Sequence, residues 1–338
     1  MSESKVKVHA PGKLILSGEH AVVYGKPALA MAVNRYVTAS ASSQRLPIVS
    51  FDLSDLAHEH SLTLTALNRL KSRLKQNYQR FISGDLKIRD VLQKPTELAQ
   101  FAFSLFVETF NLKLMQGIKI HLQSDIPMGC GMGSSAATVL SVMHAIAHHL
   151  KVELPSDIFF RLALEAENMQ HGYSSGLDLQ VSLHGGCVFM NNGNISRRAV
   201  PTMPMYLINT GAPQTTTGEC VMRAARYFKE SHIADDFAAV TEAMDLAFQA
   251  NDLIEVKRAI RANHELLVKI GVVPETVQRF IREVQGAAKI CGAGAVAGEK
   301  AGIVLVMTED IEALAALCAQ YHYSILPVAG ESRGVHIV

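Results

Sequence analysis

The sequence has few cysteines, almost no net charge and no long run of one charge sign. Its five cysteines are scattered without C-x-x-C spacing, which excludes a disulfide framework or a cysteine zinc site and favours reduced thiols in a cytoplasmic protein. A formal net charge of +1 with no basic run gives no indication of nucleic-acid or anionic-membrane binding. Residues 1–8 have no apolar core, so we expect no secretory signal there.

Walker A loops and internal repeats are also missing, and only one long uncharged run occurs. That run, residues 126–150, has the length of a membrane span. Glycine and proline interrupt its beginning, however, and three histidines lie near its end, so we interpret it as a loop followed by a helix and expect no membrane partner.

Length and hydrophobic content predict two globular domains. The chain has 338 residues, of which 49% are hydrophobic, and we place a boundary near residue 200, giving domains over 1–200 and 201–338. Alternation of strand and helix patterns in both halves predicts an α+β fold. The expected strands cover 5–10, 33–41, 118–122, 187–190, 206–209 and 303–307. The expected helices cover 55–82, 95–111, 138–150, 156–171, 218–230, 234–249, 253–270 and 311–321.

The most informative segment is the glycine loop, which we define as Ile126–Ala137, Ile-Pro-Met-Gly-Cys-Gly-Met-Gly-Ser-Ser-Ala-Ala. It follows a predicted strand and precedes a predicted helix, where free N–H groups and the positive end of the helix dipole attract anions. Glycines let a ligand approach those N–H groups, so the loop predicts a phosphate site. Its spacing fits neither a Walker A loop nor a dinucleotide-binding fingerprint, and many glycine turns before helices bind nothing.

Acidic residues and a lysine supply the remaining candidate chemistry. Asp178, among small residues after a helix, is a candidate proton acceptor for a substrate hydroxyl, although an Asp in this place also caps turns. Lys13, in an apolar surrounding, is a candidate partner for Asp178 and for a phosphate, or else a surface lysine. Either Glu165 or Glu167, but not both, faces the site, and with Ser134 or Ser135 it would suffice for Mg²⁺.

A second glycine turn, Gly292-Ala-Gly294, begins a G-x-G-x-x-A string. A dinucleotide-binding loop opens a helix, whereas this chain continues into the strand expected at 303–307. We therefore interpret it as a close-packing turn, with a further role beside the phosphate left open.

Three segments together resemble the motifs of the GHMP kinases, a family that includes galactokinase, homoserine kinase, mevalonate kinase and phosphomevalonate kinase. They are Ala10 to Ala30, the glycine loop, and Gly292-Ala-Gly294. The string Gly-Glu-His-Ala-Val-Val-Tyr-Gly, with His171-Gly to Asp178 and Asn209-Thr to Thr216, is most similar to the mevalonate kinases. Two departures are the longer, bulkier third segment, Ala295 to Gly302, and Ser174 where the mevalonate kinases usually have proline.

The resemblance implies a two-domain GHMP kinase fold, with an N-terminal domain like ribosomal protein S5 domain 2 and a ferredoxin-like C-terminal domain. It places Asp178 on the catalytic base with Lys13 beside it, and Ser135 and Glu167 on the metal ligands. Substrate contacts would come from Glu19, His20 and Thr216 together with Lys13 and Asp178. The residues implied to contact ATP are Pro127, Gly129, Gly131, Gly133, Ser134, Ser135 and Ala136.

The implied reaction is the ATP- and Mg²⁺-dependent phosphorylation of the 5-hydroxyl of (R)-mevalonate, giving 5-phosphomevalonate and ADP for isoprenoid and sterol biosynthesis. The alternatives are a phosphomevalonate kinase or another GHMP small-molecule kinase, and a non-catalytic ligand sensor on the same fold. A sensor would tend to lose its base or its metal ligand, whereas this sequence retains both. We expect a monomer or homodimer in the cytoplasm. A loose peroxisomal targeting pattern at Lys13-Leu14 and His20-Ala21 leaves a peroxisome-like organelle as the alternative.

Overall fold

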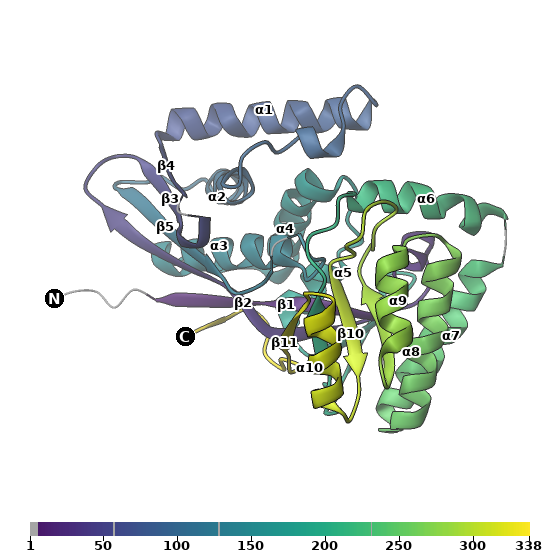
Figure 1. The fold of residues 1–338 in the computed structure, drawn as a ribbon. Coiled ribbons are helices and arrows are strands. Elements are labelled where there is room, and N and C mark those ends of the chain that lie inside the picture. The colour runs from purple at the N-terminus through teal and green to yellow at the C-terminus, as the bar shows by residue number, and fades with distance from the viewer. Residues whose placement is uncertain (1–5, 57, 128, 231) are drawn as a thin grey trace.

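A computed structural model of the protein describes residues 6–56, 58–127, 129–230 and 232–338. It contains two β-sheets flanked by helices (Figure 1). In the first sheet the strand order is β12-β1-β2-β5-β3-β4, with β6 pairing to β2 and β7 to β6. All its pairs are antiparallel except β3 with β5. The strands are β1 (Lys7–Ser17), β2 (Ala28–Gln44), β3 (Val49–Leu53), β4 (His58–Leu62), β5 (Gly117–Ser124), β6 (Cys187–Asn191), β7 (Asn194–Arg198) and β12 (His336–Ile337).

Helices cover this sheet in layers. Helix α3 packs against β1 and β2, α2 and α4 pack on α3, and α1 lies outermost on α2 (Figure 1). The bounds are η1 (Ala21–Tyr24), η2 (Ser54–Leu56), α1 (Leu64–Ile82), η3 (Ile88–Asp90), α2 (Glu97–Thr109), α3 (Ser134–Leu150), α4 (Ser156–His171) and α5 (Leu177–His184). The uncharged run at 126–150 thus forms a loop and a core helix, and in the described part of the chain no helix has the length and apolarity to cross a membrane.

The second sheet has the order β11-β8-β10-β9 and is antiparallel throughout. Numbered along the chain, this is the order 4-1-3-2 of a ferredoxin-like unit, with helices between the first and second strands and between the third and fourth. The elements are β8 (Tyr206–Asn209), α6 (Thr217–Glu230), α7 (Ile233–Gln249), α8 (Leu253–Lys269), α9 (Glu275–Glu283), β9 (Ala287–Cys291), β10 (Ile303–Met307), α10 (Ile311–Gln320) and β11 (Ser324–Pro327).

One hydrophobic core extends from the first sheet to the second. Successive side chains of a strand point to opposite faces, and β10 is buried on both. Leu305 and Met307 pack into the core shared with the first sheet, whereas Val304 and Val306 pack into the core formed with the helices of the second. The two sheets are therefore held together by buried apolar surface, which is the dominant favourable term in folding.

The mixed α+β fold class is confirmed. The proposed boundary near residue 200 falls in the connection between β7 and β8. The chain end then returns to the first sheet, where β12 pairs with β1. The last residues of the segment 201–338 thus belong spatially to the first sheet, and the division of the chain into domains stays our proposal.

Several expected boundaries were wrong, and two of them by seven residues or more. The helix expected from residue 55 begins at Leu64, because His58–Leu62 pairs with β3 in a hairpin and Thr63 caps the helix by accepting the N–H of Ala66. The strand expected to end at residue 10 continues to Ser17, because a register shift at Pro11 and Gly12 accommodates the proline and the glycine.

Candidate active site

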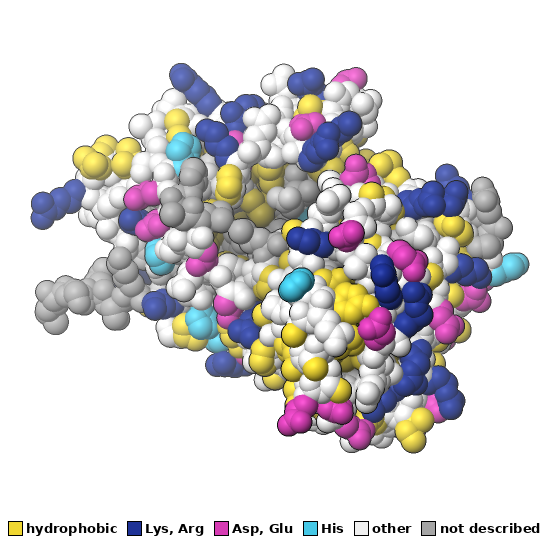
Figure 2. Space-filling view, in the orientation of Figure 1, with side chains coloured by type: hydrophobic (Ala, Val, Ile, Leu, Met, Phe, Trp, Pro, Cys, Tyr) yellow, Lys and Arg dark blue, Asp and Glu magenta, His cyan; other side chains and the backbone are white. Residues whose placement is uncertain are grey.

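The glycine loop lies between the two sheets, because Gly131 contacts both Lys13 of β1 and Cys291 of β9. The space-filling view shows that this face of the molecule is hollowed below α1 (Figure 2). Gly129, Gly131 and Gly133 have φ of 70°, 80° and 72°, a region that side chains other than glycine rarely occupy. A Cβ on Gly131 would lie 3.4 Å from the carbonyl oxygen of Cys291, so the turn at Gly292 supports the loop from behind. Met128 lies outside the described residues.

Helix α3 starts directly after this loop. It begins at Ser134, Gly133 precedes it, and no side chain caps its N-terminus. The N–H groups of the first turn, including those of Ser135 and Ala136, therefore have no helical acceptor, which is the arrangement that binds phosphate. The structure thus provides the seat that the sequence predicts, while the contacts of individual loop residues with ATP stay a prediction.

Lys13 connects the loop to the predicted base. Its Nζ lies 3.2 Å from Oδ1 of Asp178 and donates to the carbonyl of Gly131 at 3.1 Å. The lysine side chain is only 5% exposed, and that of Asp178 is 26% exposed. A Cβ on Gly133 would lie 2.8 Å from Cγ of Lys13, so the glycine makes room for the lysine stem. The interpretation of Lys13 as a solvated surface lysine is thereby wrong.

Helix α5 holds Asp178 in place. Asp178 lies in the first turn of α5, where the helix dipole favours a negative charge. The Ser182 hydroxyl donates to the carbonyl of Pro11 at 2.6 Å, which fixes α5 against β1 close to Lys13. The carboxylate is thus positioned by its helix and by its cation, and its partial exposure leaves it accessible to a substrate.

The loop before α5 is fixed by hydrogen bonds, although it has Ser174 in place of proline. The Ser174 N–H donates to Oδ1 of Asn168 at 2.8 Å, and the Ser174 hydroxyl accepts from the N–H of Gly176 at 3.2 Å. Tyr78 also donates to the carbonyl of Gly172 at 2.6 Å. Side-chain contacts thus provide the restraint that a proline ring would otherwise supply.

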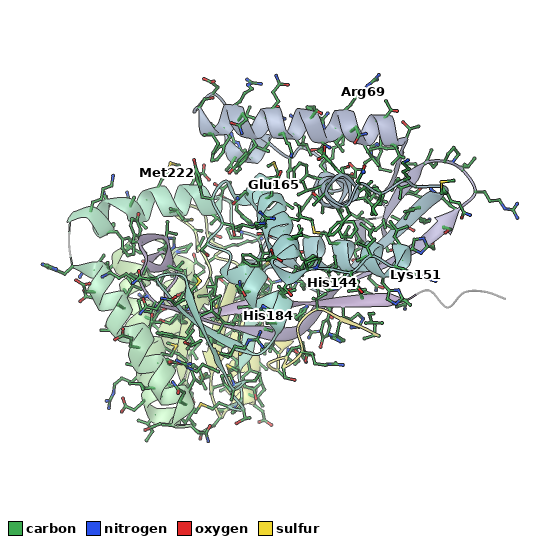
Figure 3. All side chains as sticks on the ribbon, turned by 180° about the vertical axis from the view of Figure 1, so that it is seen from behind. Arg69, His144, Lys151, Glu165, His184 and Met222 are labelled. Carbon is green, nitrogen blue, oxygen red and sulfur yellow. The ribbon has the colours of Figure 1, made fainter. Side chains whose placement is uncertain are left out.

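The two glutamates of α4 point to different sides, as their spacing predicts. Glu165 pairs with Lys75 of α1 at 2.9 Å and is labelled in Figure 3. Glu167 is instead buried, with its side chain 1% exposed. Its charge couples to those of Asp178 and Lys13. Glu167 is therefore the glutamate that faces the site, in agreement with the choice made from the motif.

Sequence analysis missed the role of His171 in this site. Its Nε2 lies 3.0 Å from Oγ of Ser135 and 3.5 Å from Oε2 of Glu167, so the imidazole connects the two predicted metal ligands. The spacing of four residues from Glu167 on one helix was the available signal.

The polar groups around Glu167 fit a divalent cation. Oε1 of Glu167 is buried and has no hydrogen-bond partner among the described residues. Burial, reinforced by the charge of Asp178, raises the pKa of this carboxyl group, against the opposing effect of His171. A buried carboxylate with one free oxygen, beside a serine hydroxyl, is a suitable hard-oxygen ligand set for Mg²⁺, and a bound cation would oppose the pKa shift.

The residues expected at the acceptor are held by protein partners. His20 is 5% exposed, has φ 63° and ψ −45°, and its Nε2 lies 3.1 Å from the carbonyl oxygen of Ala293. Burial lowers its pKa to about 4, so it is neutral at pH 7 and serves as a hydrogen-bonding group rather than the cation considered for the substrate carboxylate. Glu19 forms a buried ion pair with Lys289, a residue that the sequence did not single out.

Thr216 caps helix α6. Its hydroxyl accepts from the Glu219 N–H at 3.2 Å, and its own N–H donates to Oε2 of Glu219 at 2.7 Å, which is a capping box. Contact of Glu19, His20 and Thr216 with a substrate stays a prediction.

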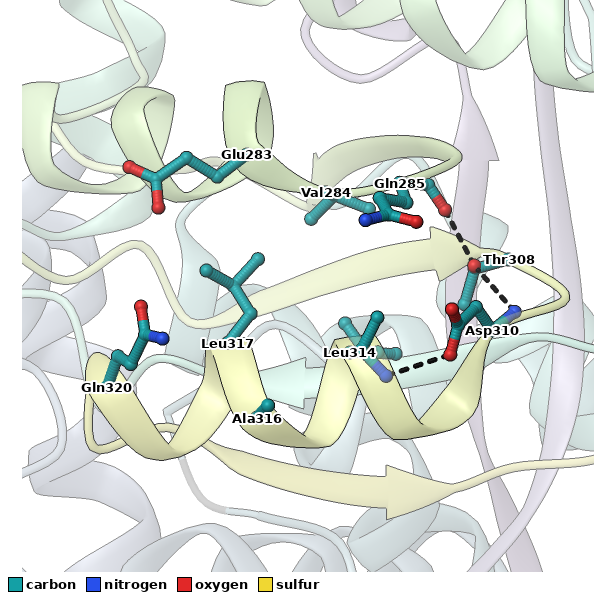
Figure 4. Close-up of a pocket in the computed structure, with 10 residues that line it drawn as sticks. Glu283, Val284, Gln285, Thr308, Asp310, Leu314, Ala316, Leu317 and Gln320 are labelled. Atoms are coloured by element: carbon teal, nitrogen blue, oxygen red, sulfur yellow. Dashed lines mark hydrogen bonds between the residues drawn. The ribbon is translucent and has the colours of Figure 1, made fainter.

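A cavity of about 290 Å³ lies away from these residues, at the opposite end of β10 (Figure 4). Its polar groups are engaged in local structure. Thr308 donates to the carbonyl of Gln285 at 2.6 Å, and Asp310 caps α10 by accepting the Ala313 N–H at 2.8 Å. We therefore assign this cavity no part in the chemistry.

Comparison with known proteins agrees with this geometry. The model of the GHMP kinases N-terminal domain matches residues 97–186, which include the glycine loop, Glu167 and Asp178. The chain is thus similar to the GHMP kinases in this domain, in its sequence relatives and in its fold.

Within that family its relatives have consistent names. The chain is 29% identical over 306 residues to a mevalonate kinase of Pyrococcus furiosus, covering 86% of each sequence. Its fold matches that of the Methanococcus jannaschii mevalonate kinase with a TM-score of 0.80, 23% identity and coverage of 98% of this chain and 99% of the other. It also matches L. major mevalonate kinase in complex with R-mevalonate, with a TM-score of 0.72, 18% identity and 98% coverage of both.

The predicted metal site leads to a test with a matched control. We expect Ser135→Ala and Glu167→Gln each to raise the Mg²⁺ concentration for half-maximal rate by about tenfold or more, because each removes an oxygen ligand from a cation with few protein ligands. Glu165→Gln, two residues away but paired with Lys75, should leave it unchanged. The measurement is a Mg²⁺ titration at fixed total ATP. An unchanged Mg²⁺ dependence in both variants would place the metal elsewhere.

Proposed function

We propose that this chain transfers the γ-phosphoryl group of ATP to the 5-hydroxyl of (R)-mevalonate, the reaction of a mevalonate kinase. The observation that carries the proposal is the contact of Lys13 with both Asp178 and the glycine loop. It joins a candidate base to a phosphate seat in one site. The names of the curated relatives over 86% of the chain support mevalonate as the acceptor.

The chemistry required of the protein is positioning and charge stabilisation. Asp178 accepts the proton of the acceptor hydroxyl. Lys13 keeps that carboxylate oriented. Two of the three N–H donors of its ammonium bind Asp178 and Gly131, which leaves one for the transferred phosphoryl group. The N–H groups at the start of α3 stabilise negative charge on the phosphates.

Ser135 and Glu167 would hold Mg²⁺, with His171 between them. When bound, the cation would neutralise charge on the β- and γ-phosphate oxygens. Glu167 lies on α4 and is connected through His171 to Ser135 at the start of α3, so its carboxylate would act on the nucleotide side of the site rather than the acceptor side.

One alternative is another enzyme of the family, a phosphomevalonate kinase. The other is a non-catalytic ligand sensor with the same fold. A phosphorylated acceptor would require additional cations around Asp178, whereas the acceptor residues His20 and Glu19 are respectively neutral at pH 7 and paired with Lys289. The paired Lys13 and Asp178 and the unpaired Glu167 oxygen favour a catalytic site over a sensor.

A coupled assay of ADP release tests the proposal directly. The purified chain is supplied with Mg·ATP and, separately, with mevalonate, phosphomevalonate, galactose or homoserine. We expect kcat/KM for mevalonate to exceed that for each other acceptor by at least about a hundredfold, since one missing or extra polar group at a buried site has effects of this size. Preference for phosphomevalonate would support the alternative, and no turnover with any acceptor would support the sensor.

The assignment of the base leads to a second test. Asp178→Asn should still bind nucleotide, since it preserves shape, while kcat falls by at least about two orders of magnitude, the usual scale for a lost general base. Equilibrium binding of ADP and steady-state turnover are measured on the same preparation. Near-normal turnover in a variant that binds ADP would remove Asp178 from the role of base.

The contact of His20 with the acceptor leads to a third test. If a substrate oxygen uses the unpartnered Nδ1 of His20, His20→Leu should raise KM for mevalonate about tenfold and leave KM for ATP nearly unchanged. His144→Leu is the control, since this histidine is partly buried and also neutral at pH 7 but packs against Phe159. An equal rise in both KM values would make His20 a structural residue that supports the turn at Ala293.

A cytoplasmic location and a monomeric or dimeric state remain part of the proposal. The five cysteines are free and buried, which suits a reducing compartment. The targeting pattern at residues 13–21 lies in β1 and η1, where Lys13 and His20 are buried. Burial of these residues in the fold favours the cytoplasm over a peroxisome-like organelle.

A further inference from the structure

The segment after the third glycine motif is longer and bulkier than the family pattern, and it introduces a lysine. We define the third-motif segment as Ala295 to Gly302. It contains Lys300, which is exposed. Lys300 has no role in the chemistry proposed above, and its contacts indicate what it could bind.

The third-motif segment is attached along its length to the strand end and loop at 209–216. The N–H of Val296 donates to Oγ1 of Thr215 at 3.2 Å, and the N–H of Ala301 donates to Oγ1 of Thr210 at 3.0 Å. At its end, the Gly302 N–H donates to the carbonyl of Gly211 at 3.1 Å. Lys300 therefore extends from a segment whose backbone is fixed on both sides.

The side chain of Lys300 lies over Gly211. A Cβ on Gly211 would lie 2.6 Å from Cδ, 3.0 Å from Cε and 3.1 Å from Nζ of Lys300. The lysine side chain thus occupies the space that a side chain at position 211 would fill. Its ammonium is placed on this loop, although it comes from a residue 89 positions later in the chain.

This position is at the edge of the glycine loop. Ala212, next to Gly211, is the nearest neighbour of a Cβ placed on Gly129, at 3.9 Å. A Cβ on Gly302, near the other side of Lys300, would lie 3.0 Å from the carbonyl oxygen of Cys130. Both backbone segments that carry the lysine and its support therefore contact the predicted phosphate seat.

The ammonium of Lys300 has no ion-pair partner in the described part of the chain, unlike Lys13, which is engaged by Asp178. A lysine binds phosphate as a compact point charge. We propose that Lys300 binds the polyphosphate of the nucleotide at the edge of the glycine loop, as a second cation beside Lys13.

The inference rests on the nucleotide half of the proposed function and is independent of the acceptor. The test measures equilibrium binding of ATP, ADP and AMP by calorimetry, without acceptor, to wild type, K300A and K300R. We expect K300A to bind ATP and ADP about tenfold more weakly, since one charge-assisted contact is lost. AMP affinity should stay within about twofold, and K300R should retain most of the affinity for ATP.

Lys229→Ala, which removes an exposed lysine from α6, is the matched control and should bind ATP like wild type. Unchanged ATP affinity in K300A overturns the proposal. An equal loss for ATP and AMP also overturns it, because that result marks a structural role. If wild type binds none of the three nucleotides, it is the proposed function that fails.

Discussion

The contact of the Lys13 ammonium with Asp178 and with the Gly131 carbonyl is the interaction on which the site depends. It joins three elements that are far apart in the sequence: β1, the glycine loop and α5. The backbone repeats the connection, since the Lys13 N–H donates to the carbonyl of Met132 at 2.9 Å. A lysine stem can pass between a strand and a loop only if the facing residue is small, which accounts for Gly133. Removing the ammonium would leave a partly buried carboxylate without its cation, a change that costs more than the pair itself contributes.

A second constraint joins the two sheets at the same place. Glu19 and Lys289 form an ion pair in which neither side chain is more than 1% exposed. Two buried charges are costly to desolvate, and truncating one leaves the other unpaired, typically at about 3–5 kcal/mol. His20 follows Glu19 and is bound to Ala293 near the end of β9. Consecutive residues of the first motif are thus fixed to the second sheet, which sets the distance across the nucleotide site. The backbone of His20 has unusual angles, which persist only where several contacts hold the residue in place.

Residues whose role depends on local pattern were predictable, and residues whose role depends on long-range contact were not. The glycine loop follows from a strand, three glycines and a helix in direct succession. The choice between Glu165 and Glu167 follows from helical geometry once the motif is recognised. The local sequence around Lys289 gives no signal for its role, because the partner of this lysine, Glu19, is 270 positions away. The hairpin of β3 and β4 was missed for a similar reason. Its local pattern is ambiguous between strand and helix, and the pairing of the two strands determines which one forms.

The distribution of charge in the site explains why nucleotide and cation belong together. The phosphate seat has a helix N-terminus on one side, but Glu167 and Asp178 lie close behind it and couple to each other electrostatically. The ammonium of Lys13 is shared between Asp178 and a carbonyl, so it offsets one carboxylate and not two. A polyphosphate without a counter-ion would therefore add negative charge beside Glu167, whose pKa is already raised by burial and by the charge of Asp178. In the proposed site, a divalent cation on Glu167 and Ser135 would offset this negative charge and add attraction for the phosphates. The buried oxygen of Glu167 without a hydrogen-bond partner thus destabilises the protein alone. The same oxygen would strengthen binding when metal and nucleotide bind as one unit.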